Sequence, residues 1–286
     1  MDSAFGRVTL FTVLVTALSF GVFAFVFFHA AEVHTYNELQ LHVTVIDTSL
    51  VSAQSLVAFD LETGTILTAK EADTVFPIAS ITKLITAALT HEADVLEATT
   101  TIVGADLASE GKAGKLALGQ TYSLRELLYP LLLESSNDAA ATFARVEPDL
   151  LERMHTFVTN AGATKTQFGD TSGLSDGNVS TAAELAVLTK KIYTQYPHIF
   201  DITQLDQFIG TYTGWGNNNP LVTEDGYEGG KHGFTESAGK TVVAIFNERL
   251  ASGTERKVGY VLLQSDNLKT DIRILREAVR SNVRFE

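Results

Sequence analysis

A long uncharged run near the N-terminus limits the possible architectures of this chain more than any other segment. The run extends from Val8 to Phe28 and contains no charged residue, with Arg7 before it and Glu32 after it. As a helix rising about 1.5 Å per residue it would span about 30 Å, the thickness of the hydrocarbon core of a bilayer. We therefore expect residues 1–31 to form an N-terminal transmembrane helix that anchors the chain, not a buried core helix.

A cleavable signal peptide is the competing interpretation of the same run. The apolar region of a signal peptide usually has about 7–15 residues and ends in a small-x-small site. This run is longer, and Phe28 and His29 stand where small residues are needed. The charge of Arg7 favours a cytoplasmic N-terminus. We expect a single-pass protein of the cell membrane with residues 32–286 outside the cytoplasm, and secretion after cleavage is the alternative.

Composition excludes several classes of protein. The chain has 286 residues and a formal net charge of −13, from 34 acidic and 21 basic side chains. Such an acidic surface argues against a nucleic-acid partner. Cysteine is absent, which excludes disulfides, thiolate metal sites and cysteine nucleophiles. The 7 histidines are scattered without metal-ligand spacing, so no metal or other cofactor is expected.

Hydrophobic periodicity divides residues 55–286 into an early hairpin, a helical middle part and a late group of strands. Two apolar runs flank Glu62-Thr63-Gly64 within Ser55–Thr68, as in a hairpin. Helices are expected over Ser80–His91, Ser123–Leu133, Asp138–Arg145, Leu150–Asn160, Ala182–Tyr193 and Leu268–Val279. Strands are expected over Phe208–Tyr212, Gly229–Phe234, Thr241–Phe246 and Lys257–Leu263. Residues 32–54 are expected to be a linker, and Gly214–Gly230 a long loop of the kind that often belongs to a site.

This order of elements predicts an α/β (α+β) domain. The early hairpin and the late strands would pair in one antiparallel sheet flanked by helices, and the middle helices would form a helical lobe. The last helix carries Leu268, Ile272, Leu275 and Val279 at spacings of four, three and four, which places them on one face. We expect that face to cover the sheet.

Three short motifs carry candidate chemistry. Ser80 and Lys83 form S-x-x-K at the start of an apolar helix, where a lysine amine can reach a serine hydroxyl one turn away. A helix N-terminus also favours a developing oxyanion. Two further S-x-x-K matches, at Ser109 and Ser237, lie among glycines without an apolar helix behind them. A helix-capping serine is the structural alternative for Ser80.

The other two motifs follow in the same chain. Ser135-Ser136-Asn137 fits S-x-N, although it could also cap the helix that follows. A second match, at Ser265-Asp266-Asn267, lies directly before the last helix, where capping is the better account. Lys231-His232-Gly233 is a K-x-G triad at the start of a strand pair, where an ordinary edge-strand lysine is the alternative.

Taken together and in this order, the motifs resemble those of the penicillin-interacting serine acyl-transferases. The chain is most similar to the serine D-alanyl-D-alanine carboxypeptidases, the low-molecular-mass penicillin-binding proteins. The similarity covers roughly residues 55–285 through the blocks VAFDLETGTIL, FPIASITKLITAAL, LLLESSNDAAATFA, FGDTSGLSDGNVSTAAELAVL and GGKHGFTESAG. The resemblance implies a β-lactamase/transpeptidase-like fold and a hydrolase of peptidoglycan stem peptides with β-lactams as inhibitors.

The resemblance also implies a role for each motif residue. Ser80 would be the acylated nucleophile, Lys83 its general base and Ser135 a proton relay. Asn137 would hold the substrate backbone, and Lys231 would bind the terminal carboxylate. The oxyanion hole would be formed by the backbone N–H groups of Ser80 and Phe234. The implied substrate-binding positions are Asn137, Lys231, His232, Gly233, Phe234 and Thr235.

His232 departs from the family pattern, which has a small hydroxyl residue at this place. An imidazole can also donate a hydrogen bond to a carboxylate, and its usual pKa of about 6.5 would let it add positive charge in mildly acidic conditions. In the alternative interpretation, His232 points away and the carboxylate is held by Lys231 and Thr235.

Four functions stay open at this stage. The first is a carboxypeptidase that removes the terminal D-Ala through an acyl-enzyme. The second is an endopeptidase that cuts cross-links with the same site. A class A-type β-lactamase would need a glutamate that positions water, and Glu184 instead reads as the start of a helix. The fourth is a catalytically weak pseudoenzyme that binds peptidoglycan, suggested by His232.

Overall fold

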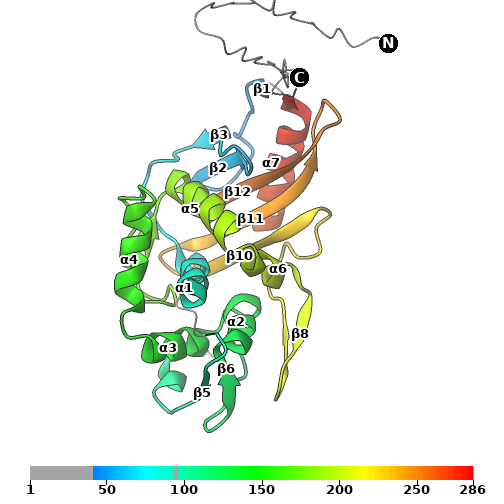
Figure 1. The fold of residues 1–286 in the computed structure, drawn as a ribbon. Helices are drawn as coiled ribbons and strands as arrows, with labels where there is room; N and C mark the ends of the chain where they lie inside the picture. Colours follow the sequence, from blue (N-terminus) through cyan, green and yellow to red (C-terminus); the bar gives the residue numbers. More distant parts are fainter. Residues whose placement is uncertain (1–40, 93–95, 112, 286) are drawn as a thin grey trace, which may run out of the picture. The chain divides into compact units, whose positions relative to one another are not determined.

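The centre of the computed structural model is a five-stranded antiparallel sheet with the strand order β10-β11-β12-β2-β3 (Figure 1). The structure describes residues 41–92, 96–111 and 113–285. The strands are β2 (Ser55–Asp60), β3 (Ile66–Lys70), β10 (Tyr227–Thr235), β11 (Gly239–Arg249) and β12 (Glu255–Ser265). The prediction that the early hairpin and late strands share one sheet is confirmed, because β2 pairs with both β3 and β12.

Each face of the sheet is covered by helices and has its own core. Side chains of the central strands alternate between the faces, so Val243 and Val261 lie in one core cluster and Val242 and Leu262 in the other. Helix α7 (Leu268–Asn282) packs on one face and α5 (Ala182–Gln195) on the other (Figure 1). The four apolar residues predicted to face the sheet from the last helix are all buried there.

The helical lobe lies beyond the α5 side of the sheet. It consists of α1 (Thr82–Glu92), α2 (Leu124–Leu133), α3 (Asn137–Val146) and α4 (Leu150–Asn160). All the helices expected from the sequence are present, with bounds shifted by a few residues at most. Side chains of Ser123, Ser136, Thr181 and Asn267 cap α2, α3, α5 and α7 by accepting a backbone N–H of the first turn.

Several short elements were not expected. Helix α6 (His198–Gln204) packs against β10, and single 3-10 turns form η1 (Ala79–Ile81) and η2 (Asp106–Ala108). Four two-stranded pairs complete the described part of the fold. Strand β1 (Leu41–Val43) pairs with β13 (Val283–Phe285), and β4 (Phe76–Pro77) pairs with β7 (Val179–Ser180). Strand β5 (Thr99–Thr101) pairs with β6 (Thr121–Ser123), and β8 (Gln207–Ile209) pairs with β9 (Gly214–Gly216).

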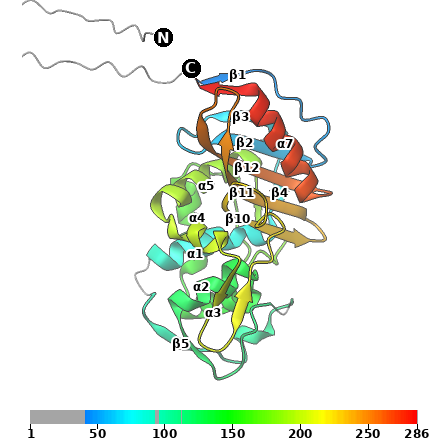
Figure 2. The ribbon, with the colours of Figure 1, turned by 90° about the vertical axis from the view of Figure 1, so that its right-hand side faces the viewer.

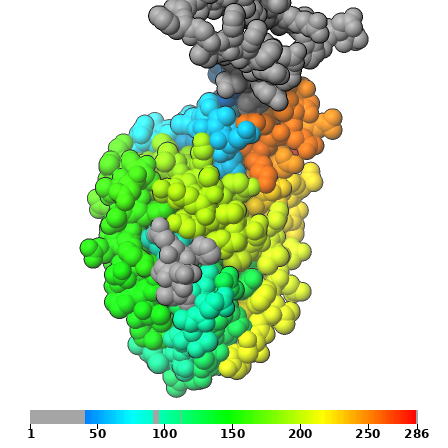
Figure 3. Space-filling model, in the orientation of Figure 1, coloured from blue at the N-terminus to red at the C-terminus, as the bar shows by residue number. Residues whose placement is uncertain are grey.

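Two predictions for residues 208–230 need correction. The strand expected over Phe208–Tyr212 ends at Ile209 and pairs with β9 instead of joining the main sheet. The loop expected over Gly214–Gly230 contains β9 and the first residues of β10. The physical reason is Trp215, which is fully buried and packs beside Phe208, so that β9 is tied down by the core. The segment lies along the lobe, as the yellow atoms beside the green ones show (Figure 3).

The expected linker over residues 32–54 is too long. Residues 41–54 belong to the folded unit, because β1 pairs with β13 and because Ile46, Val51 and Ala53 are buried against the α7 face (Figure 2). The anchor expected over residues 1–31 lies outside the described residues. Within the part of the chain that the structure describes, no helix has the length and apolar character needed to cross a bilayer.

Candidate active site

The S-x-x-K motif lies where η1 leads into α1. Ser80 is the middle residue of η1, and α1 begins at Thr82, so the serine sits just before the helix that it was expected to open. Ala79, directly before it, has a φ of 49°, a left-handed conformation that is uncommon for a residue with a side chain. The Thr82 hydroxyl donates to the Ala79 carbonyl at 2.9 Å and holds this turn in place.

Lys83 is completely buried and faces the nucleophile. Its Nζ donates to Ser80 Oγ at 3.0 Å, to Asn137 Oδ1 at 2.8 Å and to the Ser172 carbonyl at 2.5 Å. Burial lowers the pKa of Lys83 to about 7, and the negative charge of Asp170 acts in the opposite direction. A large fraction of the Lys83 amine is therefore neutral near pH 7 and is able to accept a proton.

The S-x-N motif occupies the turn between α2 and α3. The capping role that the sequence allowed for this motif is taken by its middle residue, Ser136. Ser135 has a φ of 62°, again left-handed, and Asn137 is the first residue of α3. Asn137 joins the site through its contact with Lys83, and its Nδ2 donates to the Glu110 carbonyl at 2.7 Å.

The K-x-G triad places strand β10 against η1. Lys231 is buried, and its Nζ donates to the His232 carbonyl at 2.8 Å. Burial lowers the pKa of Lys231 well below its usual value, and the charge of Lys83 lowers it further. Gly233 lies on the amide of Ser80: a Cβ built on it would be 2.6 Å from Ser80 N. A side chain at this position would push β10 away from the nucleophile.

The imidazole of His232 has a pKa far below the usual value of about 6.5. Burial is the main cause that lowers its pKa to about 3, and the charges of Lys231 and Lys83 contribute to the same shift. The imidazole is therefore neutral in mildly acidic conditions and does not carry the positive charge that an ordinary imidazole pKa would allow there. Its Nδ1 is buried and has no hydrogen-bond partner among the residues that the structure describes.

The remaining two predicted positions lie at the end of β10. Phe234 is 61% exposed. Thr235 Oγ1 accepts the Ala238 N–H at 3.1 Å and lies 3.2 Å from Ser237 Oγ. The hydroxyl of Thr235 thus helps to shape the turn between β10 and β11.

Sequence reasoning missed the loop from Phe168 to Asn178, which forms another wall of the site. It supplies the Ser172 carbonyl to Lys83, and Gly173 packs so closely on η1 that a Cβ there would lie 2.1 Å from the Ala79 carbonyl oxygen. The Asp170 carboxylate organises this loop by accepting backbone N–H groups from it. The available signal was Asp170 followed by Ser172 and Gly173, a pattern typical of a turn closed by an aspartate side chain.

The rival motifs lie outside this constellation. Ser237 is in the turn between β10 and β11, where its hydroxyl donates to the Asp176 carboxylate. Ser109 ends η2, and its motif partner Lys112 lies outside the described residues. Asn267 caps α7 by accepting the Thr270 N–H at 3.2 Å, so capping is confirmed for the second S-x-N match.

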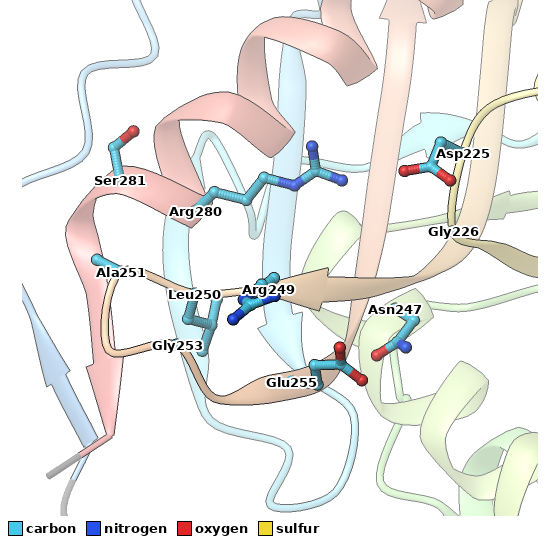
Figure 4. A pocket seen from close by; sticks show the side chains of 10 residues that line it. All are labelled: Asp225, Gly226, Asn247, Arg249, Leu250, Ala251, Gly253, Glu255, Arg280 and Ser281. Carbon is cyan, nitrogen blue, oxygen red and sulfur yellow. The ribbon is translucent and has the colours of Figure 1, made fainter.

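A pocket of about 610 Å³ lies elsewhere, at the far ends of β11 and α7 (Figure 4). Gly233 at the active site pairs with Thr241 in β11, whereas the pocket begins at Asn247 of the same strand. At about 3.3 Å per residue, roughly 20 Å of strand separates the two. Arg280, one of the pocket residues, pairs with the buried carboxylate of Glu248. The pocket is distinct from the serine site.

A serine hydroxyl 3.0 Å from a buried lysine amine of lowered pKa is an arrangement for nucleophilic catalysis, because the neutral amine can take the hydroxyl proton. Together with the sheet-and-lobe fold it defines a serine acyl-transferase or hydrolase of the Ser–Lys type. The model of the D-alanyl-D-alanine carboxypeptidase family matches residues 42–256, and the chain belongs to this family of serine peptidases.

Curated relatives include both peptidase types. A D-alanyl-D-alanine carboxypeptidase of Mycobacterium tuberculosis is 30% identical over 67% of this chain and 69% of its own length. A D-alanyl-D-alanine endopeptidase of Haemophilus influenzae is 29% identical over 72% of this chain and 74% of its own length.

Solved structures agree in fold. A D-alanyl-D-alanine carboxypeptidase from M. tuberculosis has a TM-score of 0.73 and 25% identity, and covers 83% of this chain and 91% of that one. Penicillin-binding protein D2 from Listeria monocytogenes, in its cefotaxime-bound form, has a TM-score of 0.72 and 26% identity, with 81% and 98% covered. The expectation of a penicillin-binding-protein-like fold is confirmed.

Proposed function

We propose that the chain is a serine D-alanyl-D-alanine carboxypeptidase that acts on peptidoglycan stem peptides through an acyl-enzyme. One observation carries the proposal. The completely buried Lys83 amine contacts Ser80 Oγ and Asn137 Oδ1 together and is thus placed to take the serine proton. The bond that we expect to be cleaved, the D-alanyl-D-alanine peptide bond, is inferred from the names of the relatives.

In this proposal Ser80 Oγ attacks the carbonyl carbon of the penultimate D-Ala, and its proton moves to Lys83. The resulting oxyanion is held by the backbone N–H groups of Ser80 and Phe234. Collapse of the tetrahedral intermediate breaks the C–N bond, and the leaving amine takes a proton relayed from Lys83 through Ser135. Water then attacks the ester carbonyl and gives a proton to Lys83, which is neutral again. The second collapse breaks the bond between the acyl carbon and Ser80 Oγ, the proton returns from Lys83 to Oγ, and the shortened peptide is released.

The other predicted residues bind the peptide in this proposal. Asn137 holds the substrate backbone, which requires its Nδ2 to exchange the Glu110 carbonyl for the substrate. Lys231, His232 and Thr235 surround the terminal carboxylate. Gly233 contributes to binding because it has no side chain, and only a glycine lets β10 approach Ser80 this closely.

The endopeptidase is the second candidate, favoured by relatives that carry that name. The experiment uses two purified substrates: a monomeric pentapeptide and a cross-linked dimer. Release of D-Ala from the monomer, read by mass spectrometry, supports the carboxypeptidase, and conversion of the dimer to monomers supports the endopeptidase. If neither substrate is turned over, both candidate functions are wrong.

We further propose that β-lactams acylate Ser80. Similar structures contain cefotaxime or ampicillin. A long-lived penicilloyl adduct supports this proposal, whereas rapid hydrolysis of nitrocefin would favour a β-lactamase. The glutamate considered for deacylation, Glu184, lies in the first turn of α5, and its carboxylate accepts the Lys165 N–H and the Thr166 hydroxyl. Failure of any adduct to form would favour the pseudoenzyme.

A final part of the proposal concerns location. The uncharged run from Val8 to Phe28 is the support for a membrane anchor with the peptidase unit on the outer side. A stem-peptide substrate is consistent with that side of the membrane.

A further inference from the structure

The Asp170 carboxylate is the centre of the loop that closes over Lys83. Its Oδ1 accepts the N–H groups of Ser172 at 2.7 Å and Gly173 at 2.6 Å, and its Oδ2 accepts the Ser175 N–H at 2.6 Å. The Asn178 Nδ2 also donates to Oδ1, at 3.1 Å. These bonds fold the chain back on itself within a few residues.

This fold of the loop determines where its main chain meets α1. The Ser172 carbonyl accepts from Lys83 Nζ, and the Thr171 carbonyl accepts from Thr86 Oγ1 at 2.7 Å, one turn further along α1. Gly173 lies on the Ala79 carbonyl. The loop therefore positions the lysine and the backbone before the serine together.

Charged and polar groups face Lys83 from three elements. Lys231 and the neutral His232 face it from β10, Asn137 faces it from α3, and Asp170 faces it from the loop. Burial raises the pKa of Asp170, but the N–H groups that it accepts outweigh burial and hold its pKa below the usual value. Asp170 is consequently an anion whenever Lys83 titrates.

We propose that Asp170 is a positioning residue for Lys83, one that both places the Ser172 carbonyl on the amine and contributes a fixed negative charge to its surroundings. The first part rests on the hydrogen bonds of the loop, and the second on the negative charge that those bonds stabilise. The kinetic part of the inference rests on the proposed function, because it takes Lys83 as the base.

The sign of the effect follows from the charges. Negative charge beside Lys83 favours its protonated form, so Asp170 opposes the lowering of its pKa by burial. In Asp170→Asn the amide oxygen can keep the bonds made by Oδ1, while the charge and the bond from Ser175 are lost. The pKa of Lys83 then falls below about 7, and the acid limb of kcat/KM moves to lower pH by about one pH unit.

The experiment compares pH profiles of peptide hydrolysis for the wild type, Asp170→Asn and Asp170→Glu. In Asp170→Glu the charge remains, so the acid limb stays near that of the wild type although the plateau falls. The matched control is Asp176→Asn, which removes an exposed negative charge from the same loop and leaves the limb in place. A limb in Asp170→Asn that coincides with the wild type overturns the inference.

A second measurement does not depend on turnover. Full-length protein with ¹³C-labelled lysine reports the titration of the Lys83 Cε by NMR, with Lys83→Gln used to assign the signal. The midpoint is expected to fall in Asp170→Asn and to stay in Asp176→Asn, whatever the substrate proves to be. An unchanged midpoint overturns the inference. If Asp170→Asn does not fold, Asp170→Ser takes its place, because its hydroxyl can still accept a loop N–H while the charge is lost; a midpoint equal to that of the wild type overturns the inference.

Discussion

The Lys83 amine is the residue whose state decides what the site can do. Moving the pKa of a lysine from 10.5 to about 7 corresponds to roughly 5 kcal/mol of preference for the neutral form. Complete burial provides this preference, and a general base near neutral pH is its result. In the described part of the site Lys83 contacts a hydroxyl, an amide and a carbonyl, none of which is charged.

Removal of the nucleophile is the first test at this scale. Ser80→Ala is expected to abolish the penicilloyl adduct, and Lys83→Ala to slow its formation at least 10³-fold, because nucleophile and base act as a unit. Intact-mass spectrometry after exposure to penicillin measures both. Ser109→Ala and Ser237→Ala serve as controls and should be acylated like the wild type. An adduct on a peptide that lacks Ser80 would refute the assignment.

His232 provides a second prediction. Because its imidazole is neutral above about pH 3, the KM for a D-Ala-D-Ala peptide should not follow an imidazole titration between pH 5 and 8. His232→Ala is expected to raise KM about tenfold through loss of one hydrogen bond to a carboxylate. His232→Thr should restore KM, since a hydroxyl can also donate.

Steady-state kinetics at several pH values measure these effects. An unchanged KM in His232→Ala would show that the imidazole is not a ligand. A wild-type KM that rises from pH 5 to 7 would show instead that the imidazole carries a proton in this range.

Among the elements, strand β10 lies directly against the nucleophile. Gly233→Ala places a Cβ 2.6 Å from Ser80 N and 3.0 Å from Thr241 Oγ1, so β10 must move outward. A displacement of this size is expected to slow acylation about 10²-fold while the fold persists. Gly216→Ala in β9 is the matched control, because its added Cβ has no heavy atom of the described part of the chain within 4 Å apart from its own chain neighbours. Stopped-flow acylation rates that are equal in both variants would contradict this role of β10.

The sequence predicted the large elements better than the small ones. The closing helix and the hairpin were found because their apolar spacing is regular over many residues. Strand β9 was missed, because its short Gly-Trp-Gly sequence becomes a strand only where Trp215 packs in the core beside Phe208. Helix α6 was missed for a similar reason: seven residues are too few to display a period.

In the candidate site, too, some features could be predicted from the sequence and others could not. The motif residues Ser80, Lys83 and Asn137 were predicted and do lie together, because their side chains carry the chemistry that a pattern records. The Ser172 contribution is a main-chain carbonyl, which any residue could supply. The neutral state of His232 could not be predicted either, since it depends mainly on burial and also on Lys83, which the fold brings near.

At the scale of the whole molecule, the folded unit includes residues that precede the family motifs. The Asp271 carboxylate in α7 is 1% exposed and accepts the Ser52 N–H at 2.8 Å and the Ala53 N–H at 3.0 Å. Ile46 and Val51 are buried on the same side of the sheet. The segment from 41 to 54 therefore seals one core.

Two truncations test this arrangement together with the proposed anchor. Removal of residues 1–31 is expected to give protein that purifies without detergent and acylates at the wild-type rate. Removal of residues 1–54 exposes apolar side chains and leaves Asp271 without its backbone donors, at a cost of about 3 kcal/mol, which lowers Tm by about 10 °C. Calorimetry measures the difference. Equal Tm values would mean that the segment does not stabilise the unit, and a need for detergent after the first truncation would contradict the anchor.

Two glycines, Gly173 and Gly233, pack against the turn formed by Ala79 and Ser80, and this packing has an evolutionary consequence. Gly173 and Gly233 contact Ala79 and Ser80 so closely that neither can acquire a side chain without displacing the nucleophile. The next residues outward, Leu174 and Phe234, are 40% and 61% exposed and are free of this constraint. A lineage of such enzymes can therefore exchange its outer surface, and with it the molecules it prefers, while the reacting centre stays the same.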